Sequence, residues 1–334
     1  MKQILKKLAH HSGVFRLCSR INRNILTILM YHGFSRPKDI LGLTNCKRKH
    51  LNVTDFENHL KLVTKYGTPI ALEAAILNKK LPPNPIVLTF DDGYKNNYLY
   101  AFPLLKKYKV PATIFVTTGF VDRTSYMWPD RLEFIINHAH HKNIDLIWDN
   151  NKLILELNSE ENKLKTIHSI KNCLKSFPEQ KKLSSLDKLQ DLLRVKYNWD
   201  KIPFIQLPLN WDEIREMKKS GLVAIGSHTV THPILSRCTY EEQRAELTLS
   251  RNRVIEELNE ECVLFCYPNG EVNDYNHWTI KLLKELGYVG ALTTINGYVD
   301  INNRDNFQLN RWGYAKTAED QAILISGLYR LFKK

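Results

Sequence analysis

The strongest constraint on the fold of this 334-residue chain is the regular return of short apolar runs between helical patterns. Each run has the length of a strand, and alternating strands and helices predict a mainly parallel sheet. Seven strands with helices outside them fit a distorted (β/α)7 barrel, although the pattern alone also allows an open doubly wound sheet. The predicted strands cover residues 26–31, 86–90, 112–116, 222–226, 263–267, 289–293 and 308–312.

Helical patterns lie between these strands. Capping-box patterns at residues 54–57 and 239–242 mark the start of two of them. The predicted helices cover residues 55–66, 96–108, 211–220, 240–259, 278–286 and 318–332.

Charged motifs follow two of the predicted strands. Asp91 and Asp92 come directly after one apolar run, and His228 and His232 follow another. Taken singly, Asp-Asp-Gly is often an ordinary turn and a His-x-x-x-His pair often lies on a solvated face. Together, one Asp and two His form a typical ligand set for a divalent transition metal with open positions, and the neighbouring Asp is free to act as a base. Because α/β folds place catalytic groups at the carboxyl ends of strands, the two motifs predict a metal-assisted hydrolase.

These motifs resemble those of a known family. TFDDGY at 89–94, SHTVTHP at 227–233 and YPNG at 267–270 are similar to successive signatures of the polysaccharide deacetylases, the NodB-homology group or carbohydrate esterase family four. The resemblance covers about residues 25–315, with a divergent stretch in the middle. It implies the barrel fold, Asp91 as the base, and Asp92, His228 and His232 as metal ligands, with zinc the favoured metal.

The third signature implies a loop that contacts the substrate. In the family this Pro-Gly loop walls the sugar site, which assigns Pro268 and Gly270 here. A peptide N–H on the loop would help to hold the oxyanion. Tyr267 is the expected donor, because proline has no N–H.

The general acid is expected at His32. Many members of the family carry this His in a Leu-x-x-His motif near the C-terminus, and the end of this chain has no such motif. Tyr31-His32-Gly33 ends the first predicted strand instead, which resembles the permuted poly-N-acetylglucosamine deacetylase subgroup. The first and last strands of a closed barrel are neighbours, so His32 can supply the proton; a packed structural His is the other interpretation.

A second departure concerns the arginine that orients the base in the family. It is missing before the Pro-Gly loop, where this chain reads Phe265-Cys266-Tyr267. Arg311, in the last predicted strand, is expected to replace it from a neighbouring strand. A surface salt bridge is the alternative role for Arg311.

Residues 122–210 form a region with few strand signals, which predicts a helical insertion within a barrel domain covering residues 25–334. Amphipathic helical patterns begin near residues 132, 161 and 179. The cluster at 127–131 contains Trp128, and aromatic rings stack on sugars, so Trp128 is a candidate substrate contact. The alternative is a Trp packed beneath the insertion.

The formal net charge of +13 could favour nucleic acid, anionic lipid or an acidic substrate. Nothing in the chain resembles a nucleic-acid module, so nucleic acid is not an expected partner. Residues 1–24 interleave apolar and basic side chains, which predicts a basic amphipathic segment at a membrane surface; a solvated basic surface is the alternative. No apolar signal-peptide core follows the basic start, and the six cysteines show no disulfide spacing. These features predict a cytoplasmic protein, peripheral at the inner membrane face.

The favoured function is removal of N-acetyl groups from a sugar of an envelope glycan or of its lipid-linked precursor. A carbohydrate O-acetyl esterase would use the same residues. A metal-dependent glycosyltransferase would also need paired acidic residues, but it would give no reason for the His pair. The sequence leaves the sugar, the linkage and the native metal open.

Overall fold

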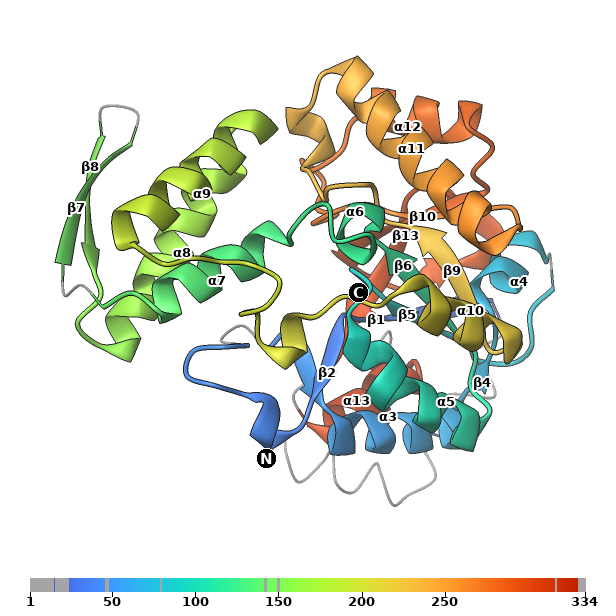
Figure 1. Cartoon of the computed structure of the whole chain (residues 1–334). Coiled ribbons are helices and arrows are strands. Elements are labelled where there is room, and N and C mark those ends of the chain that lie inside the picture. Colours follow the sequence, from blue (N-terminus) through green and yellow to red (C-terminus); the bar gives the residue numbers. More distant parts are fainter. Residues whose placement is uncertain are drawn as a thin grey trace.

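Seven parallel strands close into a barrel at the centre of the computed structural model, which describes residue 15 and residues 24–45, 48–78, 80–140, 143–148, 151–315 and 317–329. Strand β1 pairs with β5 on one side and with β13 on the other, and this double pairing closes the ring (Figure 1). Around the ring, the strands are β1 (Ile25–Tyr31), β13 (Leu309–Gly313), β11 (Gly290–Asn296), β10 (Leu264–Cys266), β9 (Val223–Ser227), β6 (Ala112–Val116) and β5 (Pro85–Phe90).

Each predicted strand coincides with one barrel strand, and the closed ring excludes the open doubly wound sheet. All six residues of β5 and all five of β6 are buried, which explains their continuous apolar character. The parallel order places the carboxyl ends of all seven strands at one end of the barrel. The acidic and histidine motifs therefore meet at that end.

Helices surround the barrel (Figure 1). They are α3 (Val53–Tyr66), α4 (Leu72–Leu77), α5 (Phe102–Tyr108), α6 (Thr118–Val121), α10 (Trp211–Lys219), α11 (Tyr240–Leu258), α12 (His277–Glu285) and α13 (Ala318–Ile325). The capping box at Thr239 is present, with its side chain and that of Glu242 satisfying each other's backbone N–H groups. The expected box at Thr54 is wrong, because α3 begins earlier and Asn52 caps it by accepting from Thr54 N.

Short elements complete the barrel domain. A π-helical turn, Asn97–Ala101, precedes α5. The remaining strands are β2 (Gly33–Ser35) paired with β3 (His50–Asn52), β4 (Thr68–Pro69) beside β5, and β12 (Val299–Asp300) antiparallel to β1.

The region between β6 and α10 builds a second hydrophobic core beside the barrel (Figure 1). It holds α7 (Trp128–Asn137), α8 (Glu160–Lys175) and α9 (Glu179–Leu193). It also holds a hairpin of β7 (Asn143–Trp148) and β8 (Asn151–Glu156), which the helical interpretation of this region missed. Buried side chains from all three helices and from β8 pack together, among them Leu132, Leu155, Ile170, Leu186 and Leu189.

Most of the predicted amphipathic segment, residues 1–24, lies outside the described residues. Phe15 is an exception: its ring is 1% exposed and packs edge-on against Tyr66 at 5.6 Å. Phe15 therefore belongs to the barrel core and is not a lipid-facing side chain. Within the part of the chain that is described, no helix is both long and apolar enough to cross a membrane.

Candidate metal centre and active site

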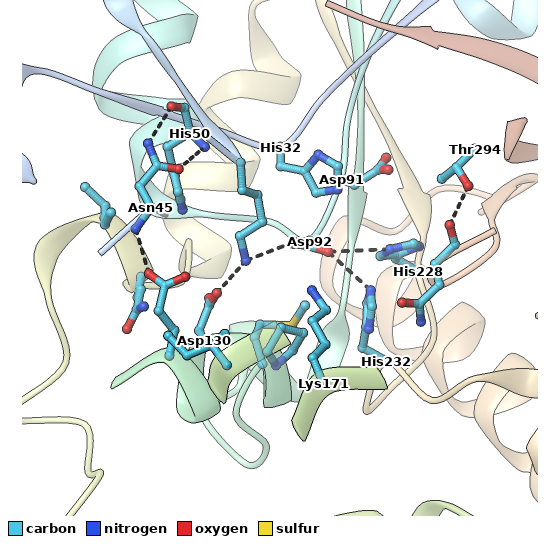
Figure 2. Close-up of a pocket in the computed structure, with 18 of the residues that line it drawn as sticks. His32, Asn45, His50, Asp91, Asp92, Asp130, Lys171, His228, His232 and Thr294 are labelled. Atoms are coloured by element: carbon cyan, nitrogen blue, oxygen red, sulfur yellow. Dashed lines mark hydrogen bonds and ion pairs between the residues drawn. The ribbon is translucent and has the colours of Figure 1, made fainter. Parts of the chain in front are cut away.

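Three ligand atoms converge at the carboxyl end of the barrel. Asp92 follows β5, and His228 and His232 follow β9. The Nε2 atoms of His228 and His232 lie 3.5 and 3.4 Å from Asp92 Oδ1. One ligand atom from each residue falls within 4.8 Å of the others, and all three residues are buried. Figure 2 shows both rings facing Asp92.

The backbone that presents these ligands is strained. Asp92 and His232 have φ angles of +76° and +60°, and Thr229 between the two His has +67°. Residues other than glycine rarely adopt these left-handed backbone angles, and those that do cluster at functional sites. The surrounding contacts hold the loop in place: Glu246 of α11 accepts hydrogen bonds from Val230 N at 2.7 Å and Thr231 N at 3.0 Å.

The polar atoms of the cluster fit a bound cation. Asp92 Oδ1, the atom that the Nε2 atoms of both His face, is buried and has no hydrogen-bond partner within the described residues. His228 Nδ1 donates to Cys266 O at 2.7 Å, which directs Nε2 of that ring toward Asp92. A carboxylate and two correctly oriented imidazoles form a three-ligand set that leaves positions for water and substrate.

The electrostatics of the cluster point the same way. Burial lowers the pKa of His232 to about 3, so that ring is neutral at pH 7, as a metal ligand must be. Burial also lowers the pKa of His228, but Cys266 and the Asp92 carboxylate outweigh it and raise that pKa well above its usual value. The surroundings of His228 therefore stabilise positive charge, either a proton on the ring or a cation bound between the ring and Asp92.

The proposed base, Asp91, is held by Arg311. The guanidinium of Arg311 is fully buried and donates to both carboxylate oxygens of Asp91, each at 2.8 Å. It also donates to Thr293 O at 2.7 Å and to Cys266 Sγ at 3.0 Å. Burial raises the pKa of Asp91, but pairing with Arg311 outweighs burial and lowers it below its usual range. Asp91 is therefore ionised at neutral pH, and the contact expected of Arg311 is present.

Arg311 also decides between two metal-ligand groups. Asp91, His228 and Cys266 offer a second set of neighbouring ligand atoms. The Arg311 guanidinium already contacts the carboxylate of Asp91 and the sulfur of Cys266, so a cation occupies that place. The set of Asp92, His228 and His232 has no such occupant within the described residues.

His32 lies in the same pocket as the ligands, between β1 and β2 (Figure 2). Burial lowers the pKa of its ring, and the carboxylates of Asp92 and Asp91 oppose this effect. The pocket combines barrel residues with residues of α7 and α8. Its walls include His32, Asn45, Lys49, His50, Asp91, Asp92, Asp130, Glu133, Lys171, His228, His232, Asn269 and Thr294.

The expected role of the Tyr267 peptide N–H is wrong. That N–H donates to Leu292 O at 3.1 Å within the sheet, so it is not available to an oxyanion. Asn269, two residues later, lines the pocket, and its Nδ2 is buried with no partner among the described residues. Gly270 has a φ of +74°, and a Cβ there would approach Thr294 N to 2.9 Å, so the loop requires glycine. Pro268 is not among the described pocket-lining residues.

Trp128 does not offer its ring to a substrate. It is 1% exposed and belongs to the second hydrophobic core, so the packed alternative is correct. The ammonium groups of Lys171 and Lys182 lie 5.7 and 4.8 Å from its ring centroid. The neighbouring residues of α7, Pro129 and Asp130, line the pocket instead.

Sequence reasoning also missed two charged pocket residues from distant segments. Lys49 Nζ lies 2.5 Å from Asp130 Oδ1 and 3.9 Å from Asp92 Oδ2. Burial lowers the pKa of Lys49, but the carboxylates of Asp130 and Asp92 outweigh burial and raise it. Asp130 belongs to the cluster at 127–131, of which the sequence favoured Trp128, and no motif marks Lys49; the two meet only because α7 packs beside the barrel.

A groove adjoins the pocket. Asn45 and His50 line both, and the Asn45 side-chain amide donates to His50 O and accepts from His50 N, each at 2.8 Å. The groove has a volume of about 480 Å³, against about 120 Å³ for the pocket. Its other walls include the ring of Tyr314 and the polar side chains of Asn52 and Asn58.

The chain is similar to proteins of known name over most of its length. Residues 78–291 match the family model described as polysaccharide deacetylase. The protein YxkH of Bacillus subtilis is 24% identical over 277 residues, which are 81% of this chain and 65% of YxkH. The poly-beta-1,6-N-acetyl-D-glucosamine N-deacetylase of Staphylococcus aureus is 31% identical over 107 residues, 31% of this chain and 34% of that enzyme. The chain therefore aligns with less than two thirds of the length of either relative.

Two solved structures share the fold. The deacetylase PplD of Streptococcus pyogenes, solved in complex with acetate, superposes with a TM-score of 0.59 at 20% identity, covering 91% of this chain and 99% of PplD. IcaB of Ammonifex degensii superposes with a TM-score of 0.57 at 18% identity, covering 91% of this chain and 98% of IcaB.

Proposed function

Because this chain belongs to the polysaccharide deacetylase family, we propose that it is a metal-dependent hydrolase that removes N-acetyl groups from a sugar of an envelope glycan or of its lipid-linked precursor. One observation carries the proposal. The ligand atoms of Asp92, His228 and His232 converge within 4.8 Å, in a pocket that also holds an ionised Asp91 and His32.

Each residue of the site has a separate role in the proposed amide hydrolysis. A divalent cation, with zinc favoured, would be held by Asp92, His228 and His232 and would polarise the acetyl carbonyl and acidify a water. Asp91, fixed by both N–H arms of Arg311, takes the proton of the attacking water. Asn269 Nδ2 is placed to donate to the carbonyl oxygen as negative charge develops there. His32 gives a proton to the departing amine.

The size of the cavities supports a glycan with more than one sugar. The pocket suits the acyl group, whereas the adjoining groove is about four times larger and is lined by amide side chains and a tyrosine ring. Such side chains bind sugar hydroxyls and stack on sugar faces. The staphylococcal relative is named for a polymer of N-acetylglucosamine, which agrees with a glycan of this type.

Acetate release tests the function directly. The panel should contain β-1,6-linked and β-1,4-linked N-acetylglucosamine oligomers, a lipid-linked N-acetylated sugar and an O-acetylated sugar, each with and without added Zn²⁺. We expect acetate from N-acetylated sugars only when metal is present. Release from the O-acetylated sugar alone would instead favour the esterase, and metal-independent release would contradict the proposed centre.

His32→Ala should lower kcat on an acetamide by about 10²- to 10⁴-fold while metal content is retained. An amine departs poorly without a proton, whereas the leaving group of an activated ester needs little help. The ester should therefore lose much less activity than the amide. His50→Ala is the matched control, because His50 lines the same pocket but its Nδ1 lies 3.2 Å from Asn96 Nδ2. An equal loss on both substrates would remove His32 from this role, and a selective loss in His50→Ala would transfer the role to that residue.

We also propose that the protein works as a cytoplasmic protein at the inner membrane face, with residues 1–24 on anionic lipid. The support is the interleaving of basic and apolar side chains in that segment. Phe15 is part of the core, so charge reversal tests the segment better than deletion. Reversing Lys2, Lys6 and Lys7 to Glu should lower the constant for binding to phosphatidylserine vesicles, measured by sedimentation at low salt, by about 100-fold or more, because three basic residues at about 1 kcal/mol each amount to about 3 kcal/mol.

The matched control reverses three exposed lysines elsewhere, Lys188, Lys219 and Lys281. Both triple variants change the net charge equally, so only the position of the charge differs. An equal effect of the two variants would show attraction by net charge alone, and vesicle binding that neither variant changes would reject the segment as an anchor.

A further inference from the structure

The side chain of Lys49 connects the barrel to α7 at the wall of the pocket. Its ammonium lies 2.5 Å from Asp130 Oδ1 and also donates to the Tyr94 hydroxyl. Tyr94 in turn donates to Asp130 Oδ2 at 2.6 Å, so the three groups form a closed triangle. These contacts fix the position of the ammonium before any substrate arrives.

An ammonium has three N–H donors, and this one has used two of them. Asp92 Oδ2, at 3.9 Å, is beyond hydrogen-bond distance, and no other acceptor is in range among the described residues. The Lys49 side chain is 24% exposed and lines the pocket. Its third N–H is therefore available to a molecule in the pocket.

The charge of this group suits a neutral acceptor. Asp130 compensates the ammonium at contact distance, so the pair has little net charge with which to attract an anion. A hydroxyl oxygen accepts a hydrogen bond from an ammonium without bringing charge of its own. Asp130 and the two His ligands lie on different sides of Asp92 (Figure 2), so Lys49 would hold a part of the substrate away from the acyl group.

We propose that Lys49 is a specificity-determining residue whose ammonium donates a hydrogen bond to a hydroxyl of the sugar ring that carries the acyl group. The inference rests on the proposed function, because it needs an acylated sugar in the pocket. Asp130 and Tyr94 act as positioning residues, since they fix the ammonium and do not need to touch the substrate.

Lys49→Met tests the contact because it keeps most of the side-chain stem and removes the donor. The probe is a β-1,6-linked N-acetylglucosamine oligomer, together with analogues that each lack one hydroxyl of the acetylated ring. Lys49→Met should lower kcat/KM on the parent oligomer by about 10- to 100-fold, the range for a hydrogen bond to a charged group. With the unaltered enzyme, kcat/KM on one deoxy analogue should be lower than on the parent oligomer by a similar factor. With Lys49→Met, kcat/KM on that analogue and on the parent should be nearly equal, because the same contact is absent from both.

Lys171→Met is the matched control, since Lys171 also lines the pocket from α8. The loss of kcat/KM caused by Lys171→Met and the loss caused by removing the same hydroxyl should be independent, so the two free-energy changes should add. Metal content and unfolding temperature, measured for every variant, separate a contact with substrate from a purely structural link between α7 and the barrel.

The outcomes are distinct. If the effect of Lys49→Met adds to the effect of removing the hydroxyl for every deoxy analogue, no hydroxyl depends on Lys49. That result would overturn the inference and leave Lys49 as a structural link. No acetate from the parent oligomer with the unaltered, metal-loaded enzyme would overturn the substrate class of the proposed function itself.

Discussion

Replacing His228 with alanine should leave the purified protein with little divalent metal and almost no acetate release. The His228 Nε2 atom lies 3.5 Å from Asp92 Oδ1, so the change removes one of three converging donors. Loss of a contact that only supports a ligand already lowers metal affinity by about 10- to 100-fold, and loss of a ligand should exceed this. Metal analysis after dialysis measures the effect directly. Unfolding temperature gives a second measure, because a ligand at 100 times its Kd stabilises a protein by about 2.7 kcal/mol.

Two further variants identify which ligand group is used. His228 belongs to both groups of neighbouring ligand atoms, but His232 belongs only to the set with Asp92 and Cys266 only to the set with Asp91. We expect His232→Ala to lose metal and Cys266→Ser to keep it. The reverse result would move the metal to the site that Arg311 fills in this structure. His277→Ala, at an exposed position, controls for the general loss of an imidazole.

Replacing Asp91 with asparagine should lower kcat by about 10²- to 10⁴-fold while the metal stays bound. The change removes the proton acceptor and keeps the size of the side chain. It also leaves the Arg311 guanidinium fully buried without its carboxylate, and breaking a buried pair in this way costs about 3–5 kcal/mol of stability. Rates must therefore be measured well below the unfolding temperature of the variant. Activity near that of the unaltered enzyme would show that Asp91 serves the structure alone.

The pH dependence of kcat/KM distinguishes a base from a structural carboxylate. A base works only when it is deprotonated, so activity should fall as the pH drops through the pKa of Asp91, which lies below the usual value of about 3.9. Arg311→Lys keeps a positive charge but cannot make both paired contacts, so the effect of burial should raise that pKa. The acidic limb should then move to higher pH. If the acidic side of the kcat/KM profile stays at the same pH in Arg311→Lys, a group other than Asp91 controls it.

The barrel could be predicted from the sequence because its signals are local. Strands β5 and β6 are buried throughout, so they appear as apolar runs such as Ile86-Val87-Leu88, and shorter apolar runs mark the other barrel strands. The motifs that follow β5 and β9 needed only the rule that parallel strands end on one side of a barrel. Strand order thus brings the Asp pair and the two His together, whereas the choice of Asp92 over Asp91 as the ligand rests on the resemblance to the deacetylase family.

The contacts that could not be predicted depend on packing between distant segments. The sequence predicts a free N–H at Tyr267, because no sequence pattern shows that it pairs with Leu292 on β11. Trp128 begins α7, and only the packing of α8 and α9 against that helix shows that its ring is covered. Lys49 and Asp130 are 81 residues apart, so their contact depends on the fold.

The β7–β8 hairpin was missed for a different reason. β7 alternates polar and apolar residues only from Asn143 to Leu146, and β8 has an apolar run at Leu153-Ile154-Leu155 between polar residues. The surrounding region is rich in lysine and strongly helical in pattern, which favoured a helical interpretation throughout. Two apolar runs of strand length on either side of the turn-forming pair Asp149-Asn150 were the signal that could have identified it.

The two cores of this protein supply different walls of the pocket. The metal ligands, Asp91 and Arg311 all stand on barrel strands or directly after them, whereas Asp130, Glu133 and Lys171 come from α7 and α8, which have a core of their own. Exchanging the residues between β6 and α10 for those of a relative would therefore rebuild one wall of the pocket and leave the hydrolytic groups in place. Contacts of this protein with the part of a substrate next to α7 and α8 can therefore change while the hydrolytic groups stay the same.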